Sequence, residues 1–327
     1  MDTVRHILSQ HISNPVSYVR PGNGPSLSHK DWVNEYNPLP DLQLHSYTYE
    51  SVNRHLGFDH AADSTEPERL ARNVYPLNSF KIYIQTEADV FRDFVQNISI
   101  PLCLAWNDDS FREKSQKGGV GPIQHNKTVD EIFTFVVPSM GNGSDHCTVI
   151  GEMKQWGVIK ANEWYNLRPR SATTKRLGQE IRGYATLYNC PQVFVYDGCW
   201  LLMIQFHAET PEEISSPNCE IDVWCLERSP EVEAELSCPV RYGLYRLIWR
   251  GWMRLLAKKG EANVLISGYR REFEGWSGRP FWRNVETGES SYSHPDNYYR
   301  RFDNEAQRWY WMHHQDGYNV AWDTIAG

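Results

Sequence analysis

The sequence of 327 residues lacks the features that mark several special classes of protein. No stretch approaches the roughly 18 consecutive apolar residues of a membrane span, and no apolar run follows a charged N-terminus as in a secretory signal peptide. The seven cysteines form no CxxC pair, and their odd number argues against a complete disulfide framework. These absences predict an intracellular protein, cytoplasmic or nuclear, with reduced thiols and no membrane partner.

The chain also lacks an excess of positive charge. Its formal net charge is −8, so the whole molecule has no field that would attract nucleic acid indiscriminately. A hydrophobic content of 40% and a charged content of 23% are those of a globular protein with a sizeable core.

One stretch, VDEIFTFVVPSMGNGSDHCTVIGEMK at residues 129–154, points to chemistry. Its two apolar segments, Val129 to Val137 and Cys147 to Ile150, flank a turn rich in Gly, Ser and Asn. This pattern predicts a β-hairpin with a long loop.

The predicted hairpin brings two acids and a lysine together. Because side chains alternate along a strand, Glu152 and Lys154 share one face, and Asp130 on the neighbouring strand can lie opposite them. Carboxylates suit Mg²⁺, which takes one or two of them and keeps several waters. We predict that Asp130 and Glu152 bind Mg²⁺, or Mn²⁺ in its place, while Lys154 orients the nucleophile or neutralises phosphate charge. Asp145 competes with Asp130 but falls in the turn, where aspartate is common, and alternation places Glu131 on the surface.

The elements around the hairpin carry a family resemblance. A predicted helix with Glu87 precedes the hairpin, a predicted helix with Gln179 follows it, and an Asp-Gly pair then marks a second hairpin. Together with the acid-led strand and Glu-x-Lys, this order resembles the PD-(D/E)XK nuclease superfamily, which has the fold of restriction endonucleases. The resemblance spans roughly residues 80 to 226, and it departs from the motif in that Val129 replaces the proline before the aspartate.

The resemblance implies a fold and an activity. The fold is α/β, with a restriction-endonuclease-like core in which helices flank a mixed central sheet. The activity is metal-dependent hydrolysis of phosphodiester bonds in nucleic acid, DNA rather than RNA. Asp130, Glu152 and Lys154 would be catalytic, with support from Glu87 and Gln179. Fungal Crinkler-type effectors and spore-killing toxins are similar in outline, which implies an intracellular toxin or effector, and many nucleases of this fold act as homodimers.

A basic segment follows the hairpin. From Lys154 to Arg182 there are seven basic residues and two acidic ones, a local charge of +5. Such a strip fits a phosphate backbone, although it is also the composition of an ordinary solvated surface. The residues predicted to bind nucleic acid are Lys160, Arg168, Arg170, Lys175, Arg176 and Arg182.

Composition divides the chain into three parts. Residues 1–79 are rich in loop formers and predict an arm or cover without chemistry, in which Trp32 and Tyr36 dock a short helix on the core. Residues 80–265 hold the nuclease-like domain. Residues 266–327 predict a small aromatic-rich β subdomain that weakly resembles a WW domain.

Two further features, a basic helix and an aromatic-rich segment, each allow more than one interpretation. The long helix predicted from Pro239 to Gly260 has arginines that face either nucleic acid or solvent. The 14 aromatics in residues 269–327 suit a structural unit, a surface that binds a protein or peptide, or a platform for stacked bases. The alternative function is therefore a catalytically inactive nuclease-like scaffold that binds a protein partner through its aromatic hairpins.

Overall fold

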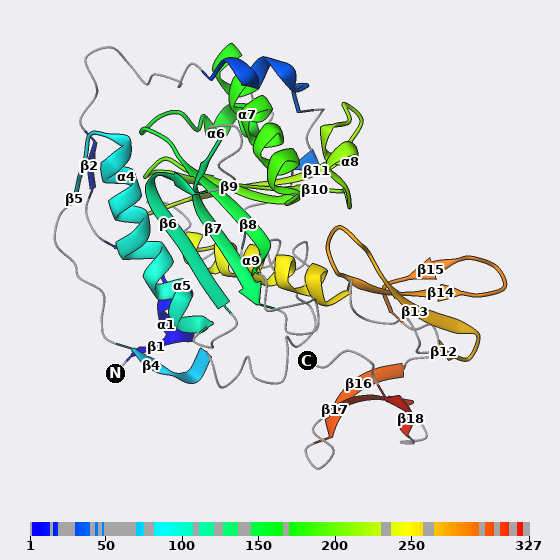
Figure 1. Cartoon of the computed structure of the whole chain (residues 1–327). Helices are drawn as coiled ribbons and strands as arrows, with labels where there is room; N and C mark the ends of the chain where they lie inside the picture. The colour runs from blue at the N-terminus through cyan, green and yellow to red at the C-terminus, as the bar shows by residue number, and fades with distance from the viewer. Residues whose placement is uncertain are drawn as a thin grey trace.

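A mixed β-sheet lies between two layers of helices in the computed structural model of the chain (Figure 1). The predicted α/β class is confirmed. The structure describes residues 2–13, 16–18, 30–39, 43–44, 48, 70–74, 82–106, 111–120, 127–136, 145–165, 170–229, 237–257, 265–293, 298–303, 308–313 and 319–322.

The sheet has seven strands in the order β3-β11-β10-β9-β8-β7-β6. In chain order they are β3 (Gln43–Leu44), β6 (Phe111–Val120), β7 (Val129–Val136), β8 (Asp145–Met153), β9 (Gln192–Tyr196), β10 (Trp200–Phe206) and β11 (Ile221–Glu227). The predicted hairpin is the β7–β8 pair, and β6 precedes it in an antiparallel meander. β9 runs parallel to β8, which requires a crossover, and α7 (Ala172–Tyr188) supplies it. β10 and β11 continue antiparallel, and β3 closes the sheet parallel to β11.

Helices cover both faces of this sheet. The elements on one face are α1 (Val4–Leu8), α4 (Glu87–Phe94), the π-helical turn η2 (Val95–Ser99), α5 (Ile100–Ala105) and α9 (Val240–Ala257). The elements on the other are α6 (Ala161–Trp164), α7 and α8 (Pro211–Ser215), while η1 (Asp31–Glu35) packs on α7. The layers are therefore helix, sheet and helix (Figure 1).

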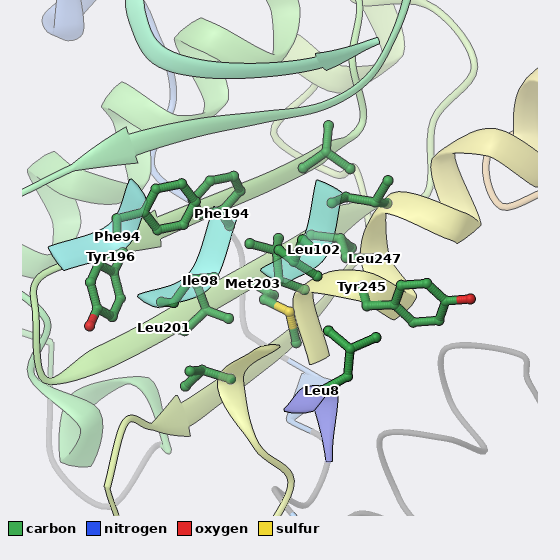
Figure 2. Close-up of a cluster of buried hydrophobic side chains, with 14 of the residues drawn as sticks. Leu8, Phe94, Ile98, Leu102, Phe194, Tyr196, Leu201, Met203, Tyr245 and Leu247 are labelled. Carbon is green, nitrogen blue, oxygen red and sulfur yellow. The ribbon is translucent and has the colours of Figure 1, made fainter. Parts of the chain in front are cut away.

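Aromatic and aliphatic side chains fill the first of these interfaces (Figure 2). Phe94 of α4 stacks on Phe194 of β9 with ring centroids 5.2 Å apart, and Leu102, Met203 and Tyr245 extend the cluster from three further elements. Each such side chain stabilises the fold by about 1.5–3 kcal/mol when it is fully buried. This interface holds α4 against the sheet and so fixes the position of the first residue of that helix.

Local signals in the sequence explain the element ends. Thr86 caps α4 in a capping box, since its hydroxyl accepts from Asp89 N–H while the Asp89 carboxylate accepts from Thr86 N–H. The predicted Asp-Gly hairpin joins β9 to β10, with Gly198 at φ 86°. The predicted long helix is α9.

The arginines of α9 face neither nucleic acid nor solvent, so both predicted alternatives are wrong for them. Arg241, Arg246, Arg250 and Arg254 are each at most 5% exposed. Arg254 donates to the Gln192 side chain and to a backbone carbonyl of β8. The helix is covered because the sheet, α1, η2 and α5 all pack against it. The Arg250 guanidinium also lies 5.1 Å from the Trp276 ring. The described contacts of these arginines are therefore with other parts of the protein.

Small β-sheets complete the fold. The C-terminal strands are β12 (Leu265–Ile266), β13 (Tyr269–Phe273), β14 (Pro280–Asn284) and β15 (Ser290–Ser291) in one antiparallel sheet, and β16 (Tyr298–Asp303), β17 (Arg308–His313) and β18 (Asn319–Trp322) in another. β1 (Asp2–Thr3) pairs with β4 (Asn73–Val74), and β2 (Val16–Tyr18) pairs with β5 (Ile82–Ile84). Among the aromatics, Trp276 stacks on His207 at 4.0 Å and Trp282 packs edge-on against Trp311, so these rings hold the fold together.

Glu131 of β7 is fully buried, contrary to its predicted surface position. It does face away from Asp130, but that face is covered by the α4, α5 and α9 layer. Burial, together with the nearby carboxylate of Glu113 on β6, raises the pKa of Glu131 to about 10. The folded protein therefore keeps Glu131 protonated at neutral pH.

This buried acid predicts a pH-dependent stability. Because the folded pKa is about 10 and the unfolded value is 4.5, the stabilisation is complete below pH 4.5 and is lost as pH rises toward 10. The loss is up to about 1.4 kcal/mol per pH unit, and Glu131→Gln, which cannot ionise, should remove it. Urea unfolding at about pH 6 and about pH 8 would show this as a smaller pH effect in Glu131→Gln than in the wild type or in the exposed control Glu286→Gln. An equal pH effect in all three proteins would contradict the prediction.

Candidate active site

The end of β8 places Glu152 and Lys154 on the face that α7 covers. Glu152 lies beside Val195 in the parallel register with β9, and Met153 points to the opposite core, as alternation predicts. Glu152 is 5% exposed and Lys154 is 4% exposed. Charged side chains this deeply buried need partners, which α7 and the N-terminal region provide.

The partners are Glu180 of α7 and Lys30, which precedes η1. Lys154 Nζ lies 2.7 Å from Glu152 Oε1 and 3.0 Å from Glu180 Oε1. Lys30 Nζ lies 2.8 Å and 2.6 Å from the same two atoms. Tyr184 of α7 also contacts the Lys30 ammonium, and its hydroxyl donates to Glu152 Oε1 at 3.4 Å. We call the two lysines and two glutamates the Lys–Glu cluster.

The charges in the Lys–Glu cluster stabilise one another. Burial opposes the positive charge of each lysine, but the carboxylates of Glu152 and Glu180 outweigh it, so the pKa values of Lys30 and Lys154 are both raised. Burial likewise opposes the charge on Glu152, and the two ammonium groups outweigh that effect, so the pKa of Glu152 is lowered. All three groups are therefore ionised at neutral pH.

Asp130 lies at the edge of the cluster, as the hairpin predicts. Its neighbour Glu131 pairs with Gly151, which brings Asp130 level with Glu152 across the β7–β8 pair. Met153 N–H donates to Asp130 Oδ2 at 2.7 Å. Burial and the Glu152 charge raise the pKa of Asp130 to about 7, despite this hydrogen bond.

The competing acid Asp145 lies at the other end of the hairpin. It pairs with Val136, eight positions before the end of β8, and it binds Arg112 at 3.0 Å and Lys114 at 2.5 Å. Asp145 is therefore separated from Glu152 by the length of the strand, and Asp130 is the acid that the fold brings to the site.

Glu87 approaches the same place from α4. It is the first residue of the helix, and the residue as a whole is exposed. Partial removal from water raises the pKa of Glu87, while the nearby Lys154 opposes this shift and Glu152 adds to it. Gln155, just after β8, donates to the carbonyl of Gln85 and ties this helix end to the strand end.

Gln179 does not join the cluster, although the resemblance implies that it supports the site. Its amide donates to the Tyr36 carbonyl at 2.8 Å. The next residue, Glu180, faces β8 instead, one turn before Tyr184 on the same side of α7. The sequence does contain a signal for Glu180. Residues four apart lie on the same face of a helix, so Glu180 and Tyr184 face the same way.

Lys30 belongs to the first 79 residues, in which the sequence indicated no side chain near the site. Its side chain is 26% exposed and reaches the buried carboxylates. The predicted docking of Trp32 and Tyr36 is confirmed, because Trp32 packs edge-on against Tyr184 of α7 at 5.1 Å and both rings lie against Gly183 of the same helix. No local pattern marks Lys30, since its partners lie 122 and 150 residues away.

The residues predicted to bind nucleic acid fall into four groups. Lys160 and Lys175 are exposed, and Arg170 and Arg176 are half-buried. Arg182 is fully buried and donates to the carbonyl of Ser216, so its predicted contact with nucleic acid is wrong. Arg168 lies outside the described residues.

One feature of the acids fits a cation. Glu152 Oε2 is buried and has no hydrogen-bond partner within the described ranges, while Asp130 stands level with it. In the part of the chain that the structure covers, no three His, Cys, Asp or Glu side chains already converge as a metal centre. Mg²⁺ needs only one or two protein carboxylates, so the acids present fit that ion.

Comparison of the chain with protein-family models, with curated proteins and with solved structures gives no match. Function must therefore be argued from the geometry of the site. Of the helices described, none has the length and apolar character needed to cross a lipid bilayer.

Proposed function

We propose that this protein is a metal-dependent nuclease that hydrolyses phosphodiester bonds in nucleic acid, with DNA as the first substrate to test. The observation that carries the proposal is the meeting of Asp130, Glu152 and Lys154 at the end of β8. The element order supports it, because a Glu-bearing helix, a meander, a crossover helix and a parallel strand follow one another as in the PD-(D/E)XK resemblance.

Asp130 and Glu152 are the residues that would hold Mg²⁺. Glu152 offers an oxygen that no hydrogen bond occupies, and Asp130 has one oxygen besides the Oδ2 bound to Met153 N–H. When bound, the ion lowers the pKa of a water and stabilises charge on the phosphate. Glu87 stands at the exposed rim, where it adds negative charge to the entrance.

The surroundings of Lys154 favour one of its two predicted roles. Its pKa is raised, so it remains an ammonium and is unable to accept a proton from water. Glu152 and Glu180 fix the ammonium in place. We therefore assign it the neutralisation of developing phosphate charge, an interaction that stabilises the transition state most when it is held in advance.

The activity assay uses the purified chain with single-stranded DNA, double-stranded DNA and RNA of one sequence. We expect cleavage of at least one substrate in Mg²⁺ or Mn²⁺, none in a chelator, and loss of the divalent-dependent cleavage in Glu152→Gln. Glu152→Gln keeps the shape of the side chain and removes its charge. Cleavage that is equal in the variant, or that survives chelation, would contradict the proposal.

A non-catalytic scaffold is the second candidate. Mutual pairing of two lysines with two glutamates is also what a purely structural ion network shows. In that case Glu152→Gln would lower the melting temperature while no wild-type cleavage is found with any substrate. The exposed Tyr292, over which the Arg279 guanidinium lies at 3.7 Å, is then the first place to look for a protein partner.

A further inference from the structure

A docked N-terminal segment supplies one of the two ammonium groups of the Lys–Glu cluster. We call residues 30–39 the strap; it begins at Lys30 and contains η1. We infer that Lys30 acts as a built-in counter-ion that competes with a divalent cation for the charge of Glu152, so that the docked strap weakens metal binding at the site. This rests on the proposed function only in taking Asp130 and Glu152 as metal ligands.

The charge count supports competition. With Lys30 in place, two ammonium groups balance two carboxylates through the Oε1 atoms of Glu152 and Glu180. Without Lys30, the two carboxylates share Lys154 alone and carry an excess negative charge, which favours a cation. A like charge a few ångströms from a bound ion weakens its binding, and solvent near the half-buried Lys30 moderates that effect.

The strap docks into notches that glycines leave on α7. A Cβ at Gly183 would lie 2.4 Å from Trp32 Cζ3, and one at Gly178 would lie 3.0 Å from Leu39 Cγ. The Trp32 ring also packs edge-on against Tyr184, with centroids 5.1 Å apart. Helix α7 is therefore shaped for the strap along two turns.

The remaining contacts of the strap are those of a separable segment. Two α7 side chains donate to its backbone, Arg176 to the Lys30 carbonyl at 3.3 Å and Gln179 to the Tyr36 carbonyl at 2.8 Å. Lys127 pairs with the exposed Glu35 at 3.3 Å. These are rim contacts, and η1 has no side-chain cap. Arg170 also donates to the Leu39 carbonyl at 3.3 Å. Release of the strap would therefore break these contacts and expose the apolar side chains of Trp32, Val33 and Leu39.

The experiment measures Mn²⁺ binding by calorimetry, because that readout does not depend on cleavage. We expect Lys30→Met to lower the Kd for Mn²⁺ roughly 10- to 100-fold relative to the wild type. Lys30→Arg keeps the charge and should bind Mn²⁺ as the wild type does. The matched control is Lys114→Met, which removes one positive charge at the far end of the hairpin. Trp32→Ala loosens the strap while Lys30 remains, and it should lower the Kd in the same direction.

The outcomes are distinct. An unchanged or higher Kd in Lys30→Met, with Trp32→Ala also unchanged, overturns the inference, as does an equal gain in Lys114→Met. Absence of Mn²⁺ binding in all folded variants overturns both the inference and the metal assignment. Tighter Mn²⁺ binding in Lys30→Met without cleavage of any nucleic acid upholds the strap and contradicts the nuclease proposal. Circular dichroism of each variant confirms that it is folded.

Discussion

The Asp93→Ala variant is expected to lose about 3–5 kcal/mol of its free energy of unfolding. Asp93 of α4 is fully buried, and its carboxylate binds Arg228 through two hydrogen bonds, from Nε at 3.2 Å and from Nη2 at 3.0 Å. Asn97 and the Tyr196 hydroxyl donate to the same carboxylate at 2.8 Å and 2.6 Å. Removing Asp93 leaves the Arg228 charge buried with its main counter-charge gone, which is the costly way to break such a pair.

A double-mutant cycle separates the pair from the cavity. Urea unfolding of Asp93→Ala, Arg228→Met and the double variant gives the coupling energy directly. We expect Asp93→Ala with Arg228→Met to be less destabilising than the sum of the single changes, because neither charge is then stranded. Strictly additive effects would show that Asp93 and Arg228 do not depend on each other.

The Lys154→Met variant is expected to cleave nucleic acid about 10²- to 10³-fold more slowly than the wild type under saturating Mg²⁺. Methionine fills a similar volume and removes the ammonium that Glu152 and Glu180 hold. Lys30 would still neutralise part of their charge, so we expect the fold to survive. Cleavage rates at several Mg²⁺ concentrations, with a melting curve for each protein, would separate a catalytic effect from unfolding.

Two control variants test whether the effect at Lys154 depends on its positive charge and on its position. Lys154→Arg should retain more activity than Lys154→Met, because it keeps the positive charge. The guanidinium group is larger than the ammonium group that it replaces and fits poorly at this buried position. Lys114→Met should cleave like the wild type, because Lys114 binds Asp145 at the opposite end of the hairpin. A folded Lys154→Met protein with wild-type cleavage would remove Lys154 from the mechanism.

The parts of the site that could be predicted are those set by local periodicity. Alternation along β8 fixes Glu152 and Lys154 on one face, and hairpin register brings Asp130 level with Glu152. The cap at Thr86 and the helix that became α7 also follow from short patterns. These signals depend on residues that are close together in the chain, so they can be recognised in the sequence.

The parts that could not be predicted depend on what covers each surface. Lys30 reaches the site from a segment of loop composition, and its partners are distant in the chain. Helical spacing places Glu180 on the same face as Tyr184, but nothing in it shows that this face meets Glu152 and Lys154. Arg182 and Arg250 look like solvated or phosphate-binding residues in the sequence, yet tertiary packing buries both. Charge composition alone does not reveal such burial.

The change from antiparallel to parallel pairing at β8 has a consequence for how the protein folds. The β7–β8 hairpin closes locally and can align Asp130 with Glu152 early, whereas Glu180 arrives only when the α7 crossover has brought β9 alongside β8. Pairing over a long loop is slow compared with hairpin closure. We therefore expect the Lys–Glu cluster to form after the β7–β8 hairpin, once α7 has docked.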